Sequence, residues 1–197
     1  MSKGETYLVQ KCQQGDVEAF EVILKMYEKR IYNFAYRMLG DKEDAMDITQ
    51  EVFIKAYKSV NAFKGNSSFS TWLFKIAKNV CIDYLRKNGK VRIFSLDKTI
   101  KMDGGEIKKE TPDTSNLPEE IVKRKEIQHV VHQAIARLPE KYKEAIILRD
   151  LQDFSYKEIA DILNCNIGTV KSRISRGRKE LKNILLYEMK HFPLTFV

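Results

Sequence analysis

A cluster of cations near the C-terminus has the residue types and spacing of a helix that contacts DNA. Six Lys and Arg side chains and one acid, Glu180, lie between Thr169 and Lys182. At about 100° of rotation per residue, an apolar stripe forms on one side of this helix, from Val170, Ile174, Gly177, Leu181 and Leu185. Cations on the rest of the surface would meet phosphates, while Ser and Arg would reach base edges. The DNA-contacting residues predicted here are Thr169, Lys171, Ser172, Arg173, Ser175, Arg176, Arg178 and Lys179.

A shorter helix should precede the basic one and complete a helix-turn-helix. Ser155 followed by Glu158 is a capping box, in which each side chain satisfies a backbone N–H of the first turn. An apolar face follows it, made of Ile159, Ala160, Ile162 and Leu163. Residues 164–166 predict a turn, with Asn166 as the cap of the basic helix. The alternative is an ordinary basic helix with a solvated outer face, but capping, turn, stripe and charge all favour DNA.

An acidic helix is predicted over residues 44–57. Five acids and one Lys lie between Asp41 and Glu51. The inward stripe comprises Ala45, Ile48, Val52 and Ala56, so Asp47, Gln50 and Ile54 point the other way. An exposed Ile beside carboxylates is typical of a docking surface for a basic protein groove. A solvated face with one stray apolar residue fits this pattern equally well.

Aromatic residues alternate with cations over residues 63–87. The segment starts as a polar loop, and Ser70 is the expected N-cap of the helix that follows. Its core stripe is Leu73, Ile76, Ala77, Val80 and Tyr84, and its outward residues are Lys75, Lys78, Asn79 and Arg86. Trp72 lies on the side of Asn79. Rings that stack on bases, amides that read them and cations that hold the backbone are what single-stranded or distorted DNA requires. Trp72 as the edge of the core is the other interpretation.

The chain divides into helical blocks around a segment of structure breakers. It has 197 residues and a net charge of +8, which suits a polyanionic partner. Helical periodicity covers residues 1–90 and 119–190, and breakers such as Gly104 and Pro112 fill residues 91–118. The formal charge is +4 for residues 1–90, 0 for residues 91–118 and +4 for residues 119–197. We therefore expect an all-α protein of two small helical domains, joined by a flexible linker at 91–118, with an apolar tail at 191–197.

Several other functional classes are disfavoured by the sequence. The chain has no run long enough to span a bilayer, so a cytoplasmic protein is expected. Its three cysteines are far apart, and His129 and His132 have no partner cluster, so neither a metal site nor a cofactor is expected. A nucleic-acid enzyme would need a catalytic constellation, and none is visible. A stand-alone helix-turn-helix regulator would bind its operator tightly as a dimer, but the acidic and aromatic–basic segments speak against it.

Five motifs occur in an order and at a spacing that resemble the bacterial extracytoplasmic-function sigma factors. They lie in residues 44–53, 69–79, 138–142, 154–160 and 168–173. The resemblance runs from about residue 15 to residue 185. It implies a subunit that binds core RNA polymerase, recognises promoter DNA and is held inactive by an anti-sigma protein, often membrane-anchored. The linker would follow the RNA-exit path of the polymerase.

The resemblance also implies roles for individual residues. The clamp helices of the polymerase would be bound by Asp47, Gln50, Glu51, Phe53 and Ile54. The promoter −10 element would be melted and read by Phe63, Ser67, Ser68, Trp72, Lys75, Lys78, Asn79, Arg86 and Lys87. The predicted DNA-contacting residues of the basic helix would read the −35 element. Relatives often carry Ala at the position of Gly177. The glycine lowers helix propensity by about 1 kcal/mol relative to Ala, and its presence suggests close packing.

Overall fold

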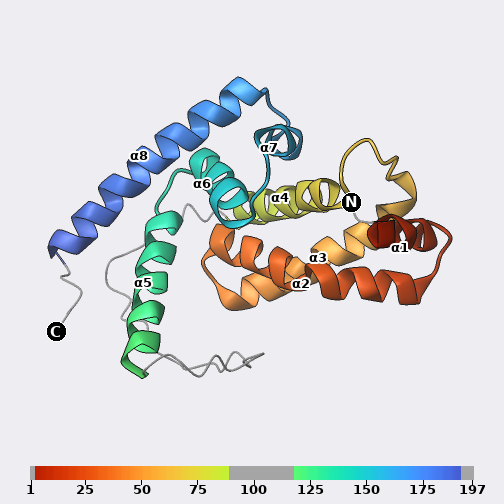
Figure 1. The fold of residues 1–197 in the computed structure, drawn as a ribbon, viewed down its shortest axis with the longest axis horizontal. Coiled ribbons are helices and arrows are strands. Elements are labelled where there is room, and N and C mark those ends of the chain that lie inside the picture. The colour runs from red at the N-terminus through yellow and green to blue at the C-terminus, as the bar shows by residue number, and fades with distance from the viewer. Residues whose placement is uncertain (1–2, 89–117, 192–197) are drawn as a thin grey trace.

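The computed structural model describes residues 3–88 and 118–191, with side chains for residues 4–88 and 127–188 (Figure 1). Within these residues the chain is helical and has no strand, which confirms the predicted all-α class. The N-terminal region contains α1 (Lys3–Gln13), α2 (Val17–Leu39), α3 (Lys42–Ser59), the 3-10 turn η1 (Val60–Ala62) and α4 (Phe69–Lys87). The C-terminal region contains α5 (Pro118–Ala136), α6 (Glu140–Ile146), the π-helical turn η2 (Ile147–Leu151), α7 (Tyr156–Leu163) and α8 (Ile167–His191).

The predicted linker and tail fall almost entirely outside the described residues. Of the linker, only Pro118 is described, and it is already the first residue of α5. Of the tail, only His191 is described, as the last residue of α8. Among the described helices, none is both long enough and apolar enough to cross a membrane.

Helices α2, α3 and α4 enclose the core of the N-terminal region. Asp16 and Asp41 cap α2 and α3, and Gly40 ends α2 in the left-handed conformation, at a φ of 79°. The predicted inward stripe of α3 is buried as expected, and Phe34, Phe69 and Phe74 fill the centre. On α4, Leu73, Ala77 and Val80 are buried, whereas Ile76 and Tyr84 are half-buried.

The start of α4 corrects one prediction. The N-cap is Ser68, whose Oγ accepts a hydrogen bond from the Thr71 backbone N–H at 3.1 Å, and Ser70 lies within the first turn. Starting the helix at Phe69 directs that ring into the core, where it is fully buried. Burial of a phenyl ring is worth more than the choice between two serine caps, so tertiary packing decides the boundary.

Helix α1 is tied to the rest of the N-terminal region by polar contacts at both ends. Near its start, the Tyr27 hydroxyl of α2 donates to the Glu5 carboxylate. At its end, the Gln13 amide donates to the carbonyl oxygens of Val60, at 3.2 Å, and Phe63, at 2.7 Å. Gln13 therefore fixes the backbone at the point where the chain leaves η1 and enters the loop before α4.

The C-terminal region contains the predicted helix-turn-helix. The capping box of Ser155 and Glu158 is present at the start of α7, and Asn164 ends α7 in the left-handed conformation, at a φ of 50°. The Asn166 side chain then accepts from the Thr169 backbone N–H at 2.7 Å, as expected of the cap of α8. A Cβ on Gly177 would lie 2.9 Å from Ile146 Cγ1, so this glycine allows α8 to approach α6 closely.

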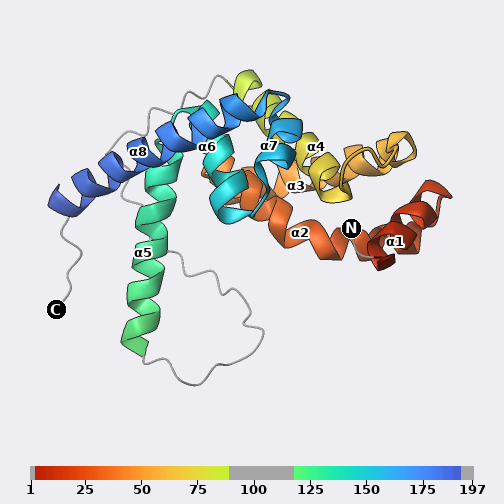
Figure 2. The same ribbon diagram turned by 45° about the horizontal axis from the view of Figure 1, so that its top comes forward.

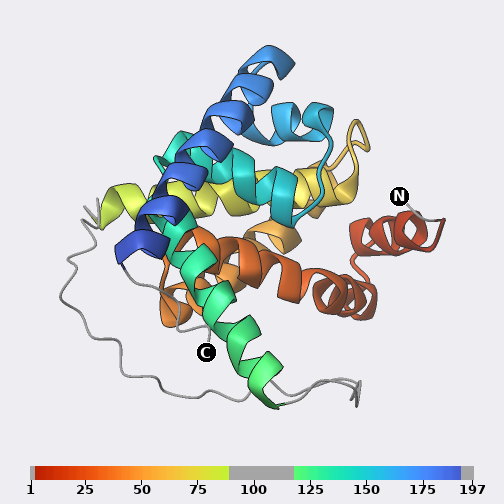
Figure 3. The ribbon, with the colours of Figure 1, turned by 60° about the vertical axis from the view of Figure 1, so that its left-hand side comes forward.

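The two regions pack against each other and share one apolar core. Helix α4 lies against α7, and α2 lies against α5 and η2 (Figures 2 and 3). At the centre of this seam, the rings of Phe74 and Phe154 meet edge to face, with centroids 4.8 Å apart. The sequence predicted two helical units but gave no indication that they would be in contact.

Candidate nucleic-acid interface

The face of α8 that the sequence predicts to contact DNA, called the recognition face below, is the solvent side of this helix, and the packing of the opposite side orients it. Val170, Ile174 and Gly177 are buried, while Leu181 and Leu185 are half-buried. Of the eight predicted DNA-contacting residues, the exposed ones are Lys171, Ser172, Ser175, Arg176, Arg178 and Lys179; Thr169 and Arg173 are half-buried. Side chains of the first two turns thus project from the N-terminal end of the helix, where a recognition helix contacts bases.

Arg178 of the recognition face has a carboxylate partner. Its Nε donates to Asp150 Oδ2 at 3.1 Å, and its Nη2 donates to Asp150 Oδ1 at 2.5 Å. This two-point contact with Asp150 raises the pKa of Arg178. Asp150 belongs to η2, so the pair joins the recognition helix to the π-helical turn. Sequence reasoning missed the pair because its members are 28 residues apart.

The backbone between η2 and α7 makes a sharp corner that sets the direction of the helix-turn-helix. Asp153 has a φ of 59°, in the left-handed region that non-glycine residues seldom adopt. The Arg149 guanidinium donates to the Phe154 carbonyl oxygen at 2.9 Å across this corner. Phe154 is thereby held with its ring in the core, and α7 begins two residues later.

The aromatic–basic surface consists of the loop before α4 and the outward side of α4. An aromatic cluster underlies it: the Phe63 ring lies 5.7 Å from Phe69 and 5.4 Å from Trp72, centroid to centroid. Phe63 is only 8% exposed, whereas Trp72 is half-buried and presents part of its indole. The resemblance implied a part for Phe63 in reading the −10 element; in this structure its ring packs against Trp72 and Phe69.

The polar members of the aromatic–basic surface surround this cluster. Ser67, Ser68 and Lys78 are half-buried, and the exposed members are Lys75, Asn79, Arg86 and Lys87. Lys78 Nζ donates to the Asn79 amide oxygen at 3.4 Å. Arg86 pairs with Asp83 at 3.4 Å, and both side chains are well exposed, so the pair contributes little and can open. The surface therefore offers cations, one amide and one indole to a strand of nucleic acid.

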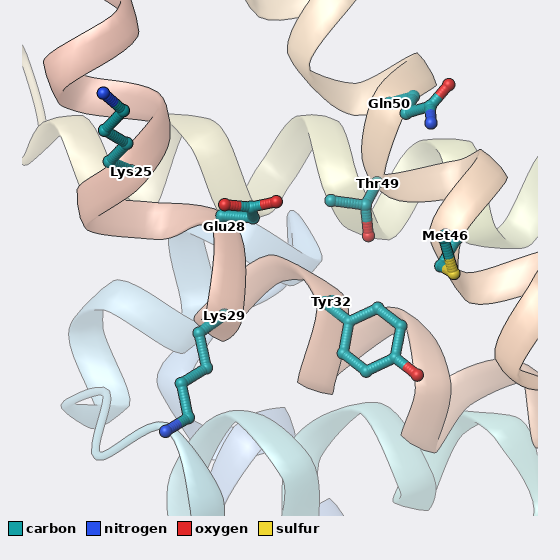
Figure 4. Close-up of a pocket in the computed structure, with 7 residues that line it drawn as sticks. All are labelled: Lys25, Glu28, Lys29, Tyr32, Met46, Thr49 and Gln50. Atoms are coloured by element: carbon teal, nitrogen blue, oxygen red, sulfur yellow. The ribbon is translucent and has the colours of Figure 1, made fainter. Parts of the chain in front are cut away.

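The acidic surface of α3 lies on another side of the N-terminal region. Asp47, Gln50, Glu51 and Ile54 are exposed, with Ile54 at 54%, and Phe53 is half-buried. Glu51 pairs with Lys55 at 2.8 Å. A groove between α2 and α3 adjoins this surface and is lined by Lys25, Glu28, Lys29, Tyr32, Met46, Thr49 and Gln50 (Figure 4). Met46, 55% exposed at this groove, was not predicted, although it lies one turn before Gln50.

Comparison with known families matches both regions of the chain. Residues 23–91 match the family Sigma-70 region 2, and residues 128–181 match Sigma-70, region 4. The chain is 39% identical to the ECF RNA polymerase sigma factor SigW of Bacillus subtilis, over 90% of this chain and 94% of that protein. It is 37% identical to the ECF RNA polymerase sigma-E factor of Escherichia coli K12, over 89% of this chain and 91% of that protein.

Solved structures share the arrangement of helices. CnrH in complex with the cytosolic domain of CnrY has a TM-score of 0.69, covers 94% of this chain and 99% of that chain, and is 20% identical, so it bears on the fold alone. The sigma factor RpoE in complex with the anti-sigma factor NepR from Bartonella quintana has a TM-score of 0.63 and is 28% identical, over 85% of this chain and 96% of that chain. With both family matches in chain order and 39% identity over most of its length, this chain belongs to the extracytoplasmic-function sigma factors of RNA polymerase.

Proposed function

We propose that this sigma factor docks on core RNA polymerase through the acidic surface of α3. The docking residues are Asp47, Gln50, Glu51, Phe53 and Ile54. Exposed carboxylates beside an exposed isoleucine favour a basic, partly apolar groove on the polymerase. The groove between α2 and α3 would enlarge this contact, because Met46 offers an adaptable apolar side chain next to Gln50. The chain itself supplies no catalytic chemistry in this proposal, since the polymerase makes the RNA.

The two DNA-facing surfaces would then read a promoter in two parts. The aromatic–basic surface, within a domain of residues 1–90, would hold the melted −10 strand, with Trp72 stacking at its edge. The recognition face, within a domain of residues 119–190, would read the −35 element in the major groove. Residues 91–118 would connect the two, and the tail at 191–197 has no assigned role. The observation that carries this proposal is the outward row of cations and hydroxyls on α8, oriented by the buried Val170 and Ile174.

Regulation by an anti-sigma protein follows from the relatives. The RpoE structure contains an anti-sigma factor, NepR, and RpoE aligns with most of this chain. We propose that an anti-sigma protein, which a membrane anchor could hold, binds this chain in the same way and competes with core polymerase. The site of action would be the cytoplasm, where polymerase and promoter DNA are found.

Run-off transcription tests this function directly. Purified bacterial core polymerase is incubated with a pooled promoter library, with and without the protein. Start sites that require the protein and share two upstream elements at fixed spacing are the expected result. An absence of such transcripts, together with tight DNA binding by the protein alone, would overturn the proposal in favour of a stand-alone helix-turn-helix regulator. Replacing Gln50 and Ile54 by Ala should lower transcription from every promoter alike, because they would contact polymerase and not DNA.

A further inference from the structure

Arg178 lies beyond the N-terminal turns of α8, which are the part of a recognition helix that contacts base edges. The helix begins at Ile167, and Arg178 follows Lys171 by seven residues. Seven residues are about two turns, so Arg178 lies on nearly the same side of α8 as Lys171 but about 10 Å further from its N-terminal end. The direction of this side chain is that of a DNA contact, whereas its position along the helix favours another role.

The two donors of Arg178 that form a fork are both engaged by Asp150. The same fork of Nε and Nη2 would be needed to hold a phosphate or the edge of a guanine in a two-point contact. Both atoms donate to the carboxylate instead, at 3.1 Å and 2.5 Å. The side chains are 54% exposed for Arg178 and 30% exposed for Asp150, and two-point geometry is what allows such a partly exposed pair to contribute. To bind through this fork, DNA would have to displace Asp150.

Asp150 stands on a segment of backbone that is anchored in the core. The π-helical turn η2 is closed by the Gln152 N–H, which donates to the Ile147 carbonyl oxygen at 3.1 Å. Ile147 and Leu148 are each 0% exposed, so they fix the turn from below. Turns of this kind are rare and occur frequently at functional sites. The carboxylate therefore offers Arg178 a fixed point of attachment.

Two consecutive residues of η2 contact the two helices of the helix-turn-helix, one each. The Arg149 guanidinium donates to the Phe154 carbonyl oxygen at 2.9 Å and lies 5.3 Å from the ring centre of Tyr156, the first residue of α7. Asp150 holds Arg178 of α8. Directional contacts thus attach both helices to the same short segment, in addition to the packing between them. This juxtaposition places η2 where it can set the orientation of α8 relative to α7.

The apolar packing beside Arg178 fixes the rotation of α8 about its own axis only loosely. Gly177 presents no side chain to α6, and a Cβ there would lie 2.9 Å from Ile146 Cγ1. Apolar contact is non-directional, whereas a two-point hydrogen bond fixes a direction. A rotation of about 15° would move a side-chain tip that lies about 5.5 Å from the helix axis by about 1.4 Å. A binding site requires its groups to be held within about 0.5 Å, so this rotation has to be prevented.

We propose that Arg178 is a positioning residue of the recognition face: with Asp150 it holds α8 at the rotation at which its N-terminal turns meet the −35 bases, and it does not bind DNA itself. This inference rests on the proposed reading of the −35 element by α8. It divides the basic helix into N-terminal turns that read DNA and a later turn that orients them. Arg178 was predicted to contact DNA because its charge and its side of the helix suit a contact; the carboxylate of Asp150 gives that charge a different use.

Removing the carboxylate distinguishes the two roles of Arg178, because they predict changes of opposite sign. Holoenzyme made from core polymerase and the full-length chain is given the −35 element found by run-off transcription in competition with its single-base variants. If Arg178 binds DNA, Asp150→Ala frees it and removes a repelling charge, so binding should tighten on every variant. If Arg178 positions α8, Asp150→Ala should lower the preference for the intact element about tenfold, the weight of one good base contact. Glu180→Ala, the same charge change at an exposed site of α8, should leave the preference unchanged.

Exchanging the two partners separates positioning from a contact with DNA. Arg178→Ala should lower the preference as Asp150→Ala does, and the double variant should lower it no further. The exchanged chain, Asp150→Arg with Arg178→Asp, restores an ion pair between the same positions and should recover most of the preference, although it turns an acid toward the DNA. An unchanged or raised preference in Asp150→Ala, or no recovery in the exchanged chain, would overturn the proposal. A salt slope of binding that falls by about 1 in Arg178→Ala would also overturn it, because this marks a lost phosphate contact.

A milder variant keeps the test decisive where the loss of the pair affects folding. Arg178→Lys retains the positive charge but cannot form the two-point fork. It should lower the preference for the intact −35 element without changing the salt slope, whereas an undiminished preference would count against positioning. Failure of the proposed function has a different signature: the unaltered chain itself would then show no preference among the −35 variants.

Discussion

Replacing Gly177 by Ala should have two opposing effects on the free energy of unfolding, because it raises helix propensity and crowds the contact between α8 and α6. Ala is favoured over Gly within a helix by about 1 kcal/mol. The new Cβ, however, would lie 2.9 Å from Ile146 Cγ1 and 3.3 Å from Tyr142 Cβ. Ile146 is 1% exposed, and its branched side chain has one preferred rotamer in a helix, so it cannot move aside cheaply. Overpacking costs about 1–3 kcal/mol, so we expect a net loss of up to about 2 kcal/mol in the free energy of unfolding.

Urea unfolding followed by circular dichroism measures this loss, and a double-mutant cycle identifies its cause. Ile146→Ala removes both close carbon atoms of the isoleucine and should itself destabilise the protein by about 2–5 kcal/mol. In that background, Gly177→Ala should become neutral or stabilising by up to about 1 kcal/mol, because the propensity gain remains and only the 3.3 Å approach to Tyr142 Cβ still opposes it. If Gly177→Ala alone stabilises the unaltered chain by that amount, the close approach of α8 to α6 is not a constraint and the reasoning is wrong.

Three other perturbations are expected to act locally. Arg176→Ala should reduce discrimination among −35 variants by about 1–3 kcal/mol in run-off transcription, whereas an equal loss on every variant would mark a phosphate contact. Burial and the nearby Arg37 lower the pKa of His132 from 6.5 to about 4. The free energy of unfolding should therefore be highest above about pH 6.5 and fall as pH falls toward 4. His132→Phe should flatten this pH profile in urea unfolding, and an unchanged profile would exclude His132 as its source. Ser155→Ala should cost about 1 kcal/mol in urea unfolding, while Ser175→Ala on the exposed side of α8 should change stability by less than about 0.5 kcal/mol.

Features that depend on neighbours in sequence could be predicted from the residues alone. The Ser155–Glu158 capping box, the Asn166 cap and the buried stripe of α8 each involve residues within a few turns of one another, so periodicity and residue type suffice. The same holds for the stripe of α3. The cap of α4 is the exception, because Ser68 and Ser70 carry the same hydroxyl and only the burial of Phe69 distinguishes them.

Features that join distant segments could not be predicted in this way. The pairing of Arg178 with Asp150 and the contact between Phe74 and Phe154 depend on how helices pack, and no local pattern encodes them. Phe63 illustrates the same limit. The resemblance implied a role for its side chain in −10 recognition, but its packing against Phe69 and Trp72 is not encoded in the local pattern. The surfaces were thus predictable as patterns, while the partners of individual side chains were not.

The two hydrogen bonds of Gln13 bear on where a minimal −10-reading fragment must begin. The Sigma-70 region 2 match starts at residue 23, so a fragment cut there would discard α1. The carbonyl groups of Val60 and Phe63 would lose their side-chain donor, and Tyr27 would lose Glu5. Such a fragment would keep every residue of the aromatic–basic surface. The loop before α4 would nevertheless lose the hydrogen bonds that fix its position. The smallest competent unit therefore starts ahead of Glu5, and the first helix is an anchor for a loop fifty residues further along the chain.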